Sequence, residues 1–358
     1  MYILGIESSC DETAVAVLRA DESGYFPLSD AIHSQIPLHR LYGGVVPEIA
    51  GRAHTEAISG LTASALQSAG IDVSALGLVA VTSHPGLIGA LLVGVNFAKS
   101  LAVSRGLPLV AVDHMKAHVA AASVASVFDP VPPPPYLALA VSGGHTSMYI
   151  VEDDVTFREI GATRDDAAGE AFDKVGRLLG FSYPAGAAFD RASAEAYARL
   201  CPEEPTVTGY IRRVRPHAAL RLPAPVMGDG SLDFSFSGLK TAAVNLLHHA
   251  GQTGEAIDRD AFCAAFTAEV TEGICSRVRM ALERHTLHGV VAAGGVSANS
   301  HLRERLRALC AETGLPFSAP PPALCGDNGL MVAAQGYREY RAGRLADSSL
   351  NASAADEP

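Results

Sequence analysis

Short apolar runs alternate with longer amphipathic stretches along the first third of the chain. The apolar runs have the length of strands, whereas the longer stretches carry apolar residues at the three-to-four spacing of a helix. Pro47 lies at the start of one such stretch, in the first helical turn that proline favours. We therefore predict strands at 2–7, 13–18, 31–35, 78–82 and 107–112, and helices at 47–69 and 89–104.

A proline-rich segment then interrupts the pattern. Residues 129–135 read Asp-Pro-Val-Pro-Pro-Pro-Pro, a run that can neither join a helix nor donate hydrogen bonds to a sheet. After it the order of elements restarts, with predicted strands at 136–141 and 146–151 around a small-residue turn. A later strand at 289–293 precedes a Gly-Gly junction, and a helix is expected at 330–340.

The restart predicts an α/β protein with two similar lobes. A strand hairpin with a small-residue turn, followed by helices, is typical of the actin-like ATPase (ASKHA) fold, which holds a ligand cleft between its lobes. A Rossmann fold fits less well, because no Gly-x-Gly-x-x-Gly follows the first strand. We assign 1–130 to an N-terminal lobe completed by a helix within 326–345, 131–325 to a C-terminal lobe, and 346–358 to a disordered tail.

The composition is that of a well-packed soluble protein. Of the 358 residues, 48% are hydrophobic and 18% are charged, and no apolar run reaches the roughly 20 residues that a membrane span needs. The first residues carry no basic leader, and the six cysteines show no CxxC spacing. We expect a cytoplasmic protein with reduced thiols and no membrane attachment. The net charge of −11 argues against a protein that coats nucleic acid.

Two histidines four residues apart suggest a metal site. His114 and His118 lie in a run of helix-forming residues, so their side chains share one helical face. Asp327, in a glycine-flanked turn far downstream, could complete a His₂-carboxylate site for iron, zinc or manganese. Cys325 is a weaker candidate ligand. The spacing alone is weak evidence, because it more often marks a solvated helix face, and a lone Asp before a helix is usually a cap.

Two glycine-rich turns could bind a phosphate. Ser142-Gly143-Gly144-His145-Thr146 separates two apolar strands, and its glycines leave backbone amides accessible to an anion. Ala293-Gly294-Gly295-Val296-Ser297-Ala298-Asn299 joins a strand to a helix, whose N-terminus would face a ligand. An ordinary hairpin turn and a simple strand-to-helix junction would look similar.

An acidic run and a mixed aromatic-hydroxyl motif complete the set of candidates. Asp166, Glu170 and Asp173 would share one face of a helix, although acids at a helix start also favour the helix dipole. The motif Phe234-Ser235-Phe236-Ser237-Gly238-Leu239-Lys240-Thr241 lies at a loop-to-helix edge and could be no more than a capped helix start.

Taken in order, these motifs resemble the TsaD family of tRNA threonylcarbamoyladenosine transferases, once known as O-sialoglycoproteases. The resemblance runs from residue 2 to about 345. It rests on Gly5 to Thr13, Tyr42 to Glu48, the histidine pair, the Ser142 turn, Asp165 to Lys174, Phe234 to Thr241, the Gly294 junction and Asp327-Asn328-Gly329. Each motif alone is weak, but eight in sequence are specific.

The resemblance implies an activity. Members of this family transfer a threonylcarbamoyl group from threonylcarbamoyl-AMP to N6 of adenosine 37, beside the anticodon of tRNAs that read ANN codons, and release AMP. It implies that His114, His118 and Asp327 bind one divalent ion, Fe²⁺ or Zn²⁺. It implies substrate contacts at Ala140, Val141, Ser142, Gly143, Gly144, Asp173, Gly186, Asp190 and Asn299. Asp11 and Glu12, in the first turn, are our candidates for the base that helps the adenine amine attack.

Some positions depart from the family pattern. His84 stands where glycine is common, Lys116 where an acid is frequent, and Ala185 and Ala187 alter a Pro-Gly-Gly-Pro segment. None of these changes removes a proposed ligand, but the two alanines bear on the shape of the nucleoside pocket.

Other classes of function are possible. A metalloprotease would carry His-Glu-x-x-His, yet Met115 occupies the position of that Glu. An actin-fold kinase acting on a small molecule, sugar or carboxylate would use the phosphate turns without the histidine pair. A regulatory ATP-binding scaffold would modify no tRNA.

A protein that binds tRNA also needs a basic surface, which it can share with partner proteins. The densest basic stretches are Arg212 to Arg221 and the trio Arg303, Arg305 and Arg307, although intramolecular ion pairs would explain them equally well. The resemblance implies a paralogous actin-like subunit and a small P-loop ATPase as bacterial partners, or a kinase-containing complex elsewhere. Such partners would share the tRNA footprint with this acidic chain.

Overall fold

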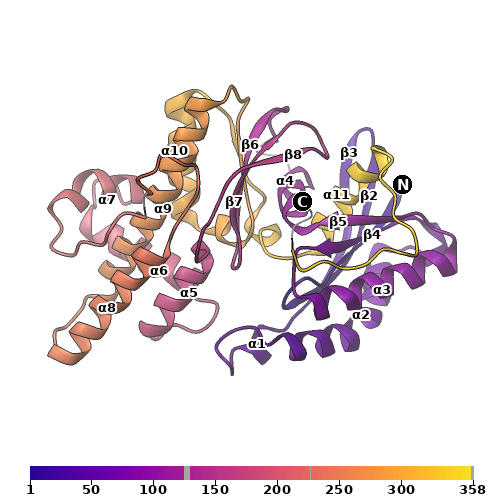
Figure 1. Cartoon of the computed structure of the whole chain (residues 1–358), viewed down its shortest axis with the longest axis horizontal. Helices are drawn as coiled ribbons and strands as arrows, with labels where there is room; N and C mark the ends of the chain where they lie inside the picture. Colours follow the sequence, from indigo (N-terminus) through magenta and orange to yellow (C-terminus); the bar gives the residue numbers. More distant parts are fainter. Residues whose placement is uncertain (125–129, 226, 356–358) are drawn as a thin grey trace. The chain divides into compact units, whose positions relative to one another are not determined.

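The computed structural model describes residues 1–124, 130–225 and 227–355, which form two compact units (Figure 1). Unit 1 comprises Met1–Val131, Glu152–Phe157 and Pro320–Pro358, and unit 2 comprises Pro132–Val151 and Arg158–Ala319. The sequence analysis places Glu152–Phe157 and 320–325 in the second lobe, but both stretches group with unit 1.

Unit 1 is built on a five-stranded sheet in the order β3-β2-β1-β4-β5. β1 pairs antiparallel with β2 and parallel with β4, and β5 continues the parallel half. The strands are β1 (Tyr2–Glu7), β2 (Glu12–Asp21), β3 (Gly24–Ser34), β4 (Leu76–His84) and β5 (Leu109–Asp113).

Helices cover both faces of this sheet, because alternate strand residues point to opposite sides. Ile3 packs toward α4 (His114–Val124) and α11 (Gly329–Arg341), whereas Leu4 packs toward α2 (Pro47–Ala69) and α3 (Ile88–Arg105) (Figure 1). The short helix α1 (Ile36–His39) precedes α2. Among the described residues, α3 is the one helix long and apolar enough to cross a membrane, and its buried residues contact β4 and α2.

Unit 2 repeats the sheet of unit 1 with other strands. Its order, β8-β7-β6-β9-β10, again places three consecutive strands beside two parallel ones. The strands are β6 (Tyr136–Val141), β7 (Thr146–Val151), β8 (Phe157–Ala162), β9 (Val290–Ala293) and β10 (Phe317–Ser318). The predicted duplication is therefore confirmed at the level of strand order.

The helices of unit 2 surround one apolar core. Most of the long helix α9 (Arg259–Arg284) is buried, and it packs against α6 (Gly186–Leu200). The remaining helices are α5 (Ala168–Leu178), α7 (Val207–Arg213), α8 (Ser237–Thr253) and α10 (Ser300–Thr313). Phe189, Phe262 and Phe266 form the centre of this core.

The chain after residue 346 departs from the expectation of a disordered tail. Ala346 donates a backbone hydrogen bond to Leu109, and Ser353 donates one to Ser83. Leu350 packs against the α2–α3 side of the sheet, and its carbonyl accepts from Lys99. Hydrogen bonds and apolar contacts thus hold residues 346–353 on unit 1. Of the expected tail, 356–358 lie outside the described residues.

Candidate functional site

The two predicted metal-binding histidines lie at the carboxyl end of β5, an edge strand of the unit 1 sheet. β5 ends at Asp113 and α4 begins at His114, where the Asp113 carboxylate accepts hydrogen bonds from the amides of Met115 and Lys116. This cap satisfies amides of the first helical turn and fixes where the helix begins. His114 and His118 therefore project from one face of α4, one turn apart.

Asp327 reaches the same place through the packing of α11. Asn328 caps this helix by accepting from the amide of Met331. A Cβ atom on Gly329 would clash with the backbone of Ala16, and one on Gly5 would clash with the carbonyl oxygen of Gly329. The helix start thus lies directly on β1 and β2, and this close approach sets the position of Asp327.

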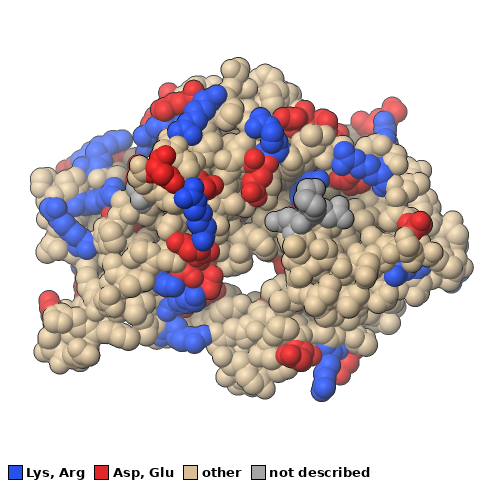
Figure 2. All heavy atoms as spheres, in the orientation of Figure 1, with Lys and Arg blue, Asp and Glu red and all other residues tan. Residues whose placement is uncertain are grey.

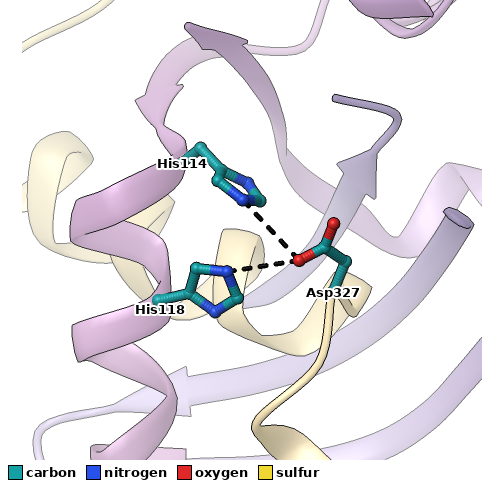
Figure 3. A group of neighbouring side chains, drawn as sticks. All are labelled: His114, His118 and Asp327. Carbon is teal, nitrogen blue, oxygen red and sulfur yellow. Dashed lines mark ion pairs between the residues drawn. The ribbon is translucent and has the colours of Figure 1, made fainter. Parts of the chain in front are cut away.

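The three side chains meet around one point. His118 Nε2 lies 3.2 Å and His114 Nε2 lies 3.6 Å from the same Asp327 oxygen, as Figure 3 shows. Their potential ligand atoms all lie within 4.8 Å of one another. The structure thus brings His114, His118 and Asp327 together, and among the described residues they are the only such cluster of three or more.

The environment of His118 fits a metal ion. Its side chain is 0% exposed, and neither ring nitrogen has a hydrogen-bond partner among the described residues. A buried polar group without a hydrogen bond is costly, so a Lewis acid accepting the imidazole lone pair would offset that cost. Two imidazoles and one carboxylate are a donor set that suits Fe²⁺ or Zn²⁺.

Charge around His114 also favours a cation. Burial opposes protonation of this imidazole, but the carboxylates of Glu7 and Asp327 outweigh burial and raise the His114 pKa to about 9. Glu7 contacts Nδ1 of the ring at 3.1 Å. The sequence analysis places Glu7 in a strand and in the Gly5 to Thr13 motif but gives it no role at the site.

The turn between β1 and β2 brings two more acids close to Asp327. Burial, followed by the charges of Asp327 and Asp11, raises the Glu12 pKa to about 9. Glu12 therefore holds a proton at neutral pH and accepts a hydrogen bond from Ser34 at 3.1 Å. Of the two candidate bases, this arrangement favours Asp11 as the proton acceptor.

In unit 2, three segments converge on the Ser142 turn. The turn is closed by a hydrogen bond from the Ser142 amide to the His145 carbonyl. A Cβ atom on Gly169, at the start of α5, would lie 2.6 Å from the Ser142 carbonyl oxygen, and one on Gly294 would lie 2.5 Å from that of Val141. The N-terminus of α5 thus lies beside Gly143, and the exposed backbone of Gly143 and Gly144 is accessible to an anion.

The remaining predicted contact residues of unit 2 join neighbouring helices. Asp173, on α5, accepts from the amide of Ala185 just before Gly186 begins α6. Asp190, on α6, accepts from the amide and hydroxyl of Ser300. Asn299 caps α10 through the amides of His301 and Leu302. These residues therefore tie α5, α6 and α10 together beside the Gly294 junction.

The acidic run and the Phe234–Thr241 motif bind each other. Asp165 accepts from the amides of Phe236 and Ser237, at the start of α8. Asp166 forms ion pairs with Lys174 and Lys240. Sequence reasoning treats the two motifs separately, because nothing in either one reveals that the other is its partner.

The basic stretches are largely ion-paired. Arg213 pairs with Glu203 and Glu204, and Arg215 forms two hydrogen bonds with the buried carboxylate of Glu269. Arg305 pairs with acids on α9 and α10. The alternative of intramolecular ion pairs is confirmed for these arginines, which leaves less unpaired charge for a nucleic acid.

Comparisons with known proteins point to one family. Residues 27–334 match the family described as tRNA N6-adenosine threonylcarbamoyltransferase. The protein of that name from Moorella thermoacetica is 44% identical over 350 residues, covering 98% of this chain and 95% of the relative. The one from Geobacillus kaustophilus is 44% identical over 353 residues, with the same coverage of 98% and 95%.

Solved structures share the fold at low sequence identity. Component A of the Acidaminococcus fermentans (R)-2-hydroxyglutaryl-CoA dehydratase has a TM-score of 0.52 at 14% identity, covering 95% of this chain and 99% of that one. Full-length HypF has a TM-score of 0.57 at 15% identity, covering 99% of this chain and 47% of that one. Both have the actin-like ATPase fold, so the predicted fold class is confirmed.

Proposed function

Because the chain belongs to the tRNA N6-adenosine threonylcarbamoyltransferase family, we propose that it transfers a threonylcarbamoyl group to N6 of adenosine 37 in tRNA. The proposed donor is threonylcarbamoyl-AMP, the proposed acceptors are tRNAs that read ANN codons, and AMP is released. The observation that carries the proposal beyond family membership is the buried His118 ring beside His114 and Asp327. A kinase on this fold has no need of that cluster.

Unit 2 would recognise the adenylate. The amides of Gly143 and Gly144, backed by the N-terminus of α5, suit the phosphate. Asp173, Gly186, Asp190 and Asn299 would surround the nucleoside. The hydrogen bonds that Asp173, Asp190 and Asn299 accept from backbone amides hold the starts of α6 and α10 in place. Preformed contacts of this kind lower the entropy cost of orienting the donor.

Unit 1 would carry out the transfer. His114, His118 and Asp327 would hold the Fe²⁺ or Zn²⁺ ion, which supplies a Lewis acid for oxygens of the donor. Attack by N6 forms a carbon–nitrogen bond and breaks the bond between the carbamoyl carbon and the phosphate oxygen, which leaves with AMP. Asp11 accepts the proton that N6 loses, and protonated Glu12 donates a hydrogen bond to a substrate oxygen.

This function implies partners and a location. The tRNA is the macromolecular substrate, and a paralogous actin-like subunit with a small P-loop ATPase would complete a bacterial assembly. A tRNA-modifying role places the protein in the cytoplasm.

Elemental analysis and a transfer assay test the proposal together. The wild-type protein should bind about one metal ion and, with threonine, bicarbonate, ATP, the synthase that makes the donor and any required partner subunits, produce threonylcarbamoyladenosine in tRNA. His118→Ala should lose the metal and the transfer activity, because a buried ligand is missing. Adenylate binding should partly survive, since unit 2 is unchanged.

His249→Ala is the matched control, because His249 is an exposed histidine on α8. It should keep both metal and activity. Full transfer by a metal-free His118→Ala protein would contradict the proposed mechanism, and absence of any adduct from the complete wild-type assembly would contradict the proposed function.

A further inference from the structure

Glu7 is a fully buried carboxylate at the end of β1. Its side chain is 0% exposed, on the same face of the strand as the buried apolar residue Ile3. An ionised group in such a place is stable only if polar partners replace water. The identity of those partners therefore indicates what the carboxylate does.

Three donors surround this carboxylate. One oxygen accepts from the amide of Ser9 at 2.5 Å. The other accepts from the Thr82 hydroxyl at 2.6 Å and lies 3.1 Å from Nδ1 of His114. Ser9 and Thr82 are buried as well, so these contacts are shielded from water. An ionised carboxylate can only accept hydrogen bonds, which requires Nδ1 of His114 to carry a hydrogen.

Nδ1 of His114 lies 3.1 Å from Glu7 and 3.3 Å from the Ser9 hydroxyl, which can donate or accept. The carboxylate can only accept, so it decides which nitrogen of His114 carries the hydrogen. When Nδ1 carries its hydrogen, the neutral ring has its lone pair on Nε2. That nitrogen is the one directed at Asp327, at 3.6 Å. His118 has no such partner among the described residues, because neither of its ring nitrogens is hydrogen-bonded. The two candidate ligands on α4 are thus oriented differently: a hydrogen bond to Glu7 orients His114, whereas packing orients His118.

We propose that Glu7 is a positioning residue for the metal centre, fixing the tautomer and ring orientation of His114 so that Nε2 is the ligand atom. This inference rests on the proposed metal-dependent function. Carboxylates that bind the far nitrogen of a ligating histidine typically change metal affinity by about 10- to 100-fold when removed. Thr82 supports Glu7 in turn, through the short bond to the same oxygen.

The test uses Zn²⁺ as the probe and Glu7→Gln as the variant, because glutamine has the same shape without the charge. The Zn²⁺ dissociation constant should rise by about 10- to 100-fold. In ¹⁵N-histidine spectra of the zinc-loaded wild-type protein, His114 should show a protonated Nδ1 and a coordinated Nε2. In Glu7→Gln this pattern should be lost or mixed, because the amide can donate to Nδ1 as well as accept from it.

Two further variants keep the test decisive. Glu339→Gln removes another buried carboxylate of unit 1, one that is bonded to Gln335 and Arg344. It should leave Zn²⁺ binding and the His114 spectrum unchanged.

Thr82→Val keeps the shape of the side chain on β4 and removes only one hydrogen bond to Glu7. It should therefore weaken Zn²⁺ binding as Glu7→Gln does, but by a smaller factor. It serves in place of Glu7→Gln if that variant fails to fold.

The readouts separate this inference from the proposed function, since zinc binding and ring-nitrogen assignment require no tRNA. Wild-type Zn²⁺ affinity and an unchanged His114 pattern in Glu7→Gln, or in Thr82→Val if it is used instead, would overturn the positioning role. A protein that passes both readouts but modifies no tRNA would overturn the proposed function alone.

Discussion

At the scale of single residues, the carboxyl groups of Glu7 and Asp30 in unit 1 have pKa values that shift in opposite directions. Burial opposes ionisation of Glu7, but the neighbouring His114 outweighs it and lowers the Glu7 pKa. The Asp30 side chain, on β3, accepts a hydrogen bond from the amide of Gly329 at 3.2 Å, and burial raises its pKa to about 6. A cation partner, rather than burial alone, therefore decides whether a buried acid is charged.

Asp30→Asn should stabilise the protein at neutral pH. The folded pKa of about 6 lies above the ordinary Asp value of 3.8, so folding favours the protonated acid. The contribution of Asp30 to stability is full below pH 4, falls as the pH rises to 6, and stays low above it. Asparagine keeps an acceptor for Gly329, so the variant should gain about 1–3 kcal/mol at pH 7 and little at pH 4. Urea unfolding at several pH values measures this difference.

Asp21→Asn is a control in which the change of stability at neutral pH should have the opposite sign. Hydrogen bonds from Ser23 lower the Asp21 pKa, so its contribution is present at neutral pH and lost as the pH falls. This exposed variant should lose rather than gain stability at pH 7. An Asp30→Asn protein that is no more stable than wild type at pH 7 would show that Asp30 is not held out of water.

Residue-level prediction succeeded where the signal was local or carried by the family. His114 and His118 were predicted as metal ligands from their spacing, and Asp327 was predicted from its motif. Glu7 was missed because its partners Thr82 and His114 lie 75 and 107 residues away in the sequence. A strand pattern reports which face a residue occupies, but not which distant donor it meets there.

At the scale of elements, small residues bring α11 close to the sheet. Gly329 lies against Ala16 of β2, and Gly336 lies against Ala80 of β4. The helix at 330–340 was predicted from its own pattern, but its contact with these strands was not. Likewise only 31–35 of β3 was predicted, and β8 not at all. Almost no residue of either strand is fully buried, so neither has the continuous apolar run of a core strand.

Gly329→Ala should weaken both folding and metal binding. The added Cβ would lie 2.5 Å from the Ala16 amide nitrogen, which is backbone and cannot rotate away. Such overpacking typically costs about 1–3 kcal/mol, and moving the start of α11 would also move Asp327. Thermal unfolding and Zn²⁺ titration measure the two effects.

Gly326→Ala is the matched control, since Gly326 lies beside Asp327 on the other side and a Cβ there would meet no atom within 4 Å. It should change neither property by much. Equal behaviour of the two variants would mean that close packing of α11 does not position the ligand.

At the scale of the whole molecule, the negative net charge of the chain opposes binding of the proposed tRNA substrate, which is also negatively charged. The chain has a net charge of −11, and on the visible face of unit 2 acidic and basic side chains lie interspersed (Figure 2). The arginines of α7 illustrate this, because Arg212 and Arg213 both pair with acids just before the helix. A phosphate backbone would have to compete with Glu203 and Glu204 for these arginines.

We predict that the stretch from Arg212 to Arg221 nevertheless contacts tRNA, and that opposite changes of charge there act in opposite directions. Replacing Arg212, Arg213 and Arg221 by Glu should weaken tRNA binding and reduce the slope of affinity against salt by about one unit for each lost phosphate contact. Replacing Glu203 and Glu204 by Gln should strengthen binding, because the paired arginines would be released for phosphates. Filter binding at several salt concentrations measures both variants in the complete assembly. If neither change alters affinity or its salt dependence, these arginines serve only the fold of unit 2.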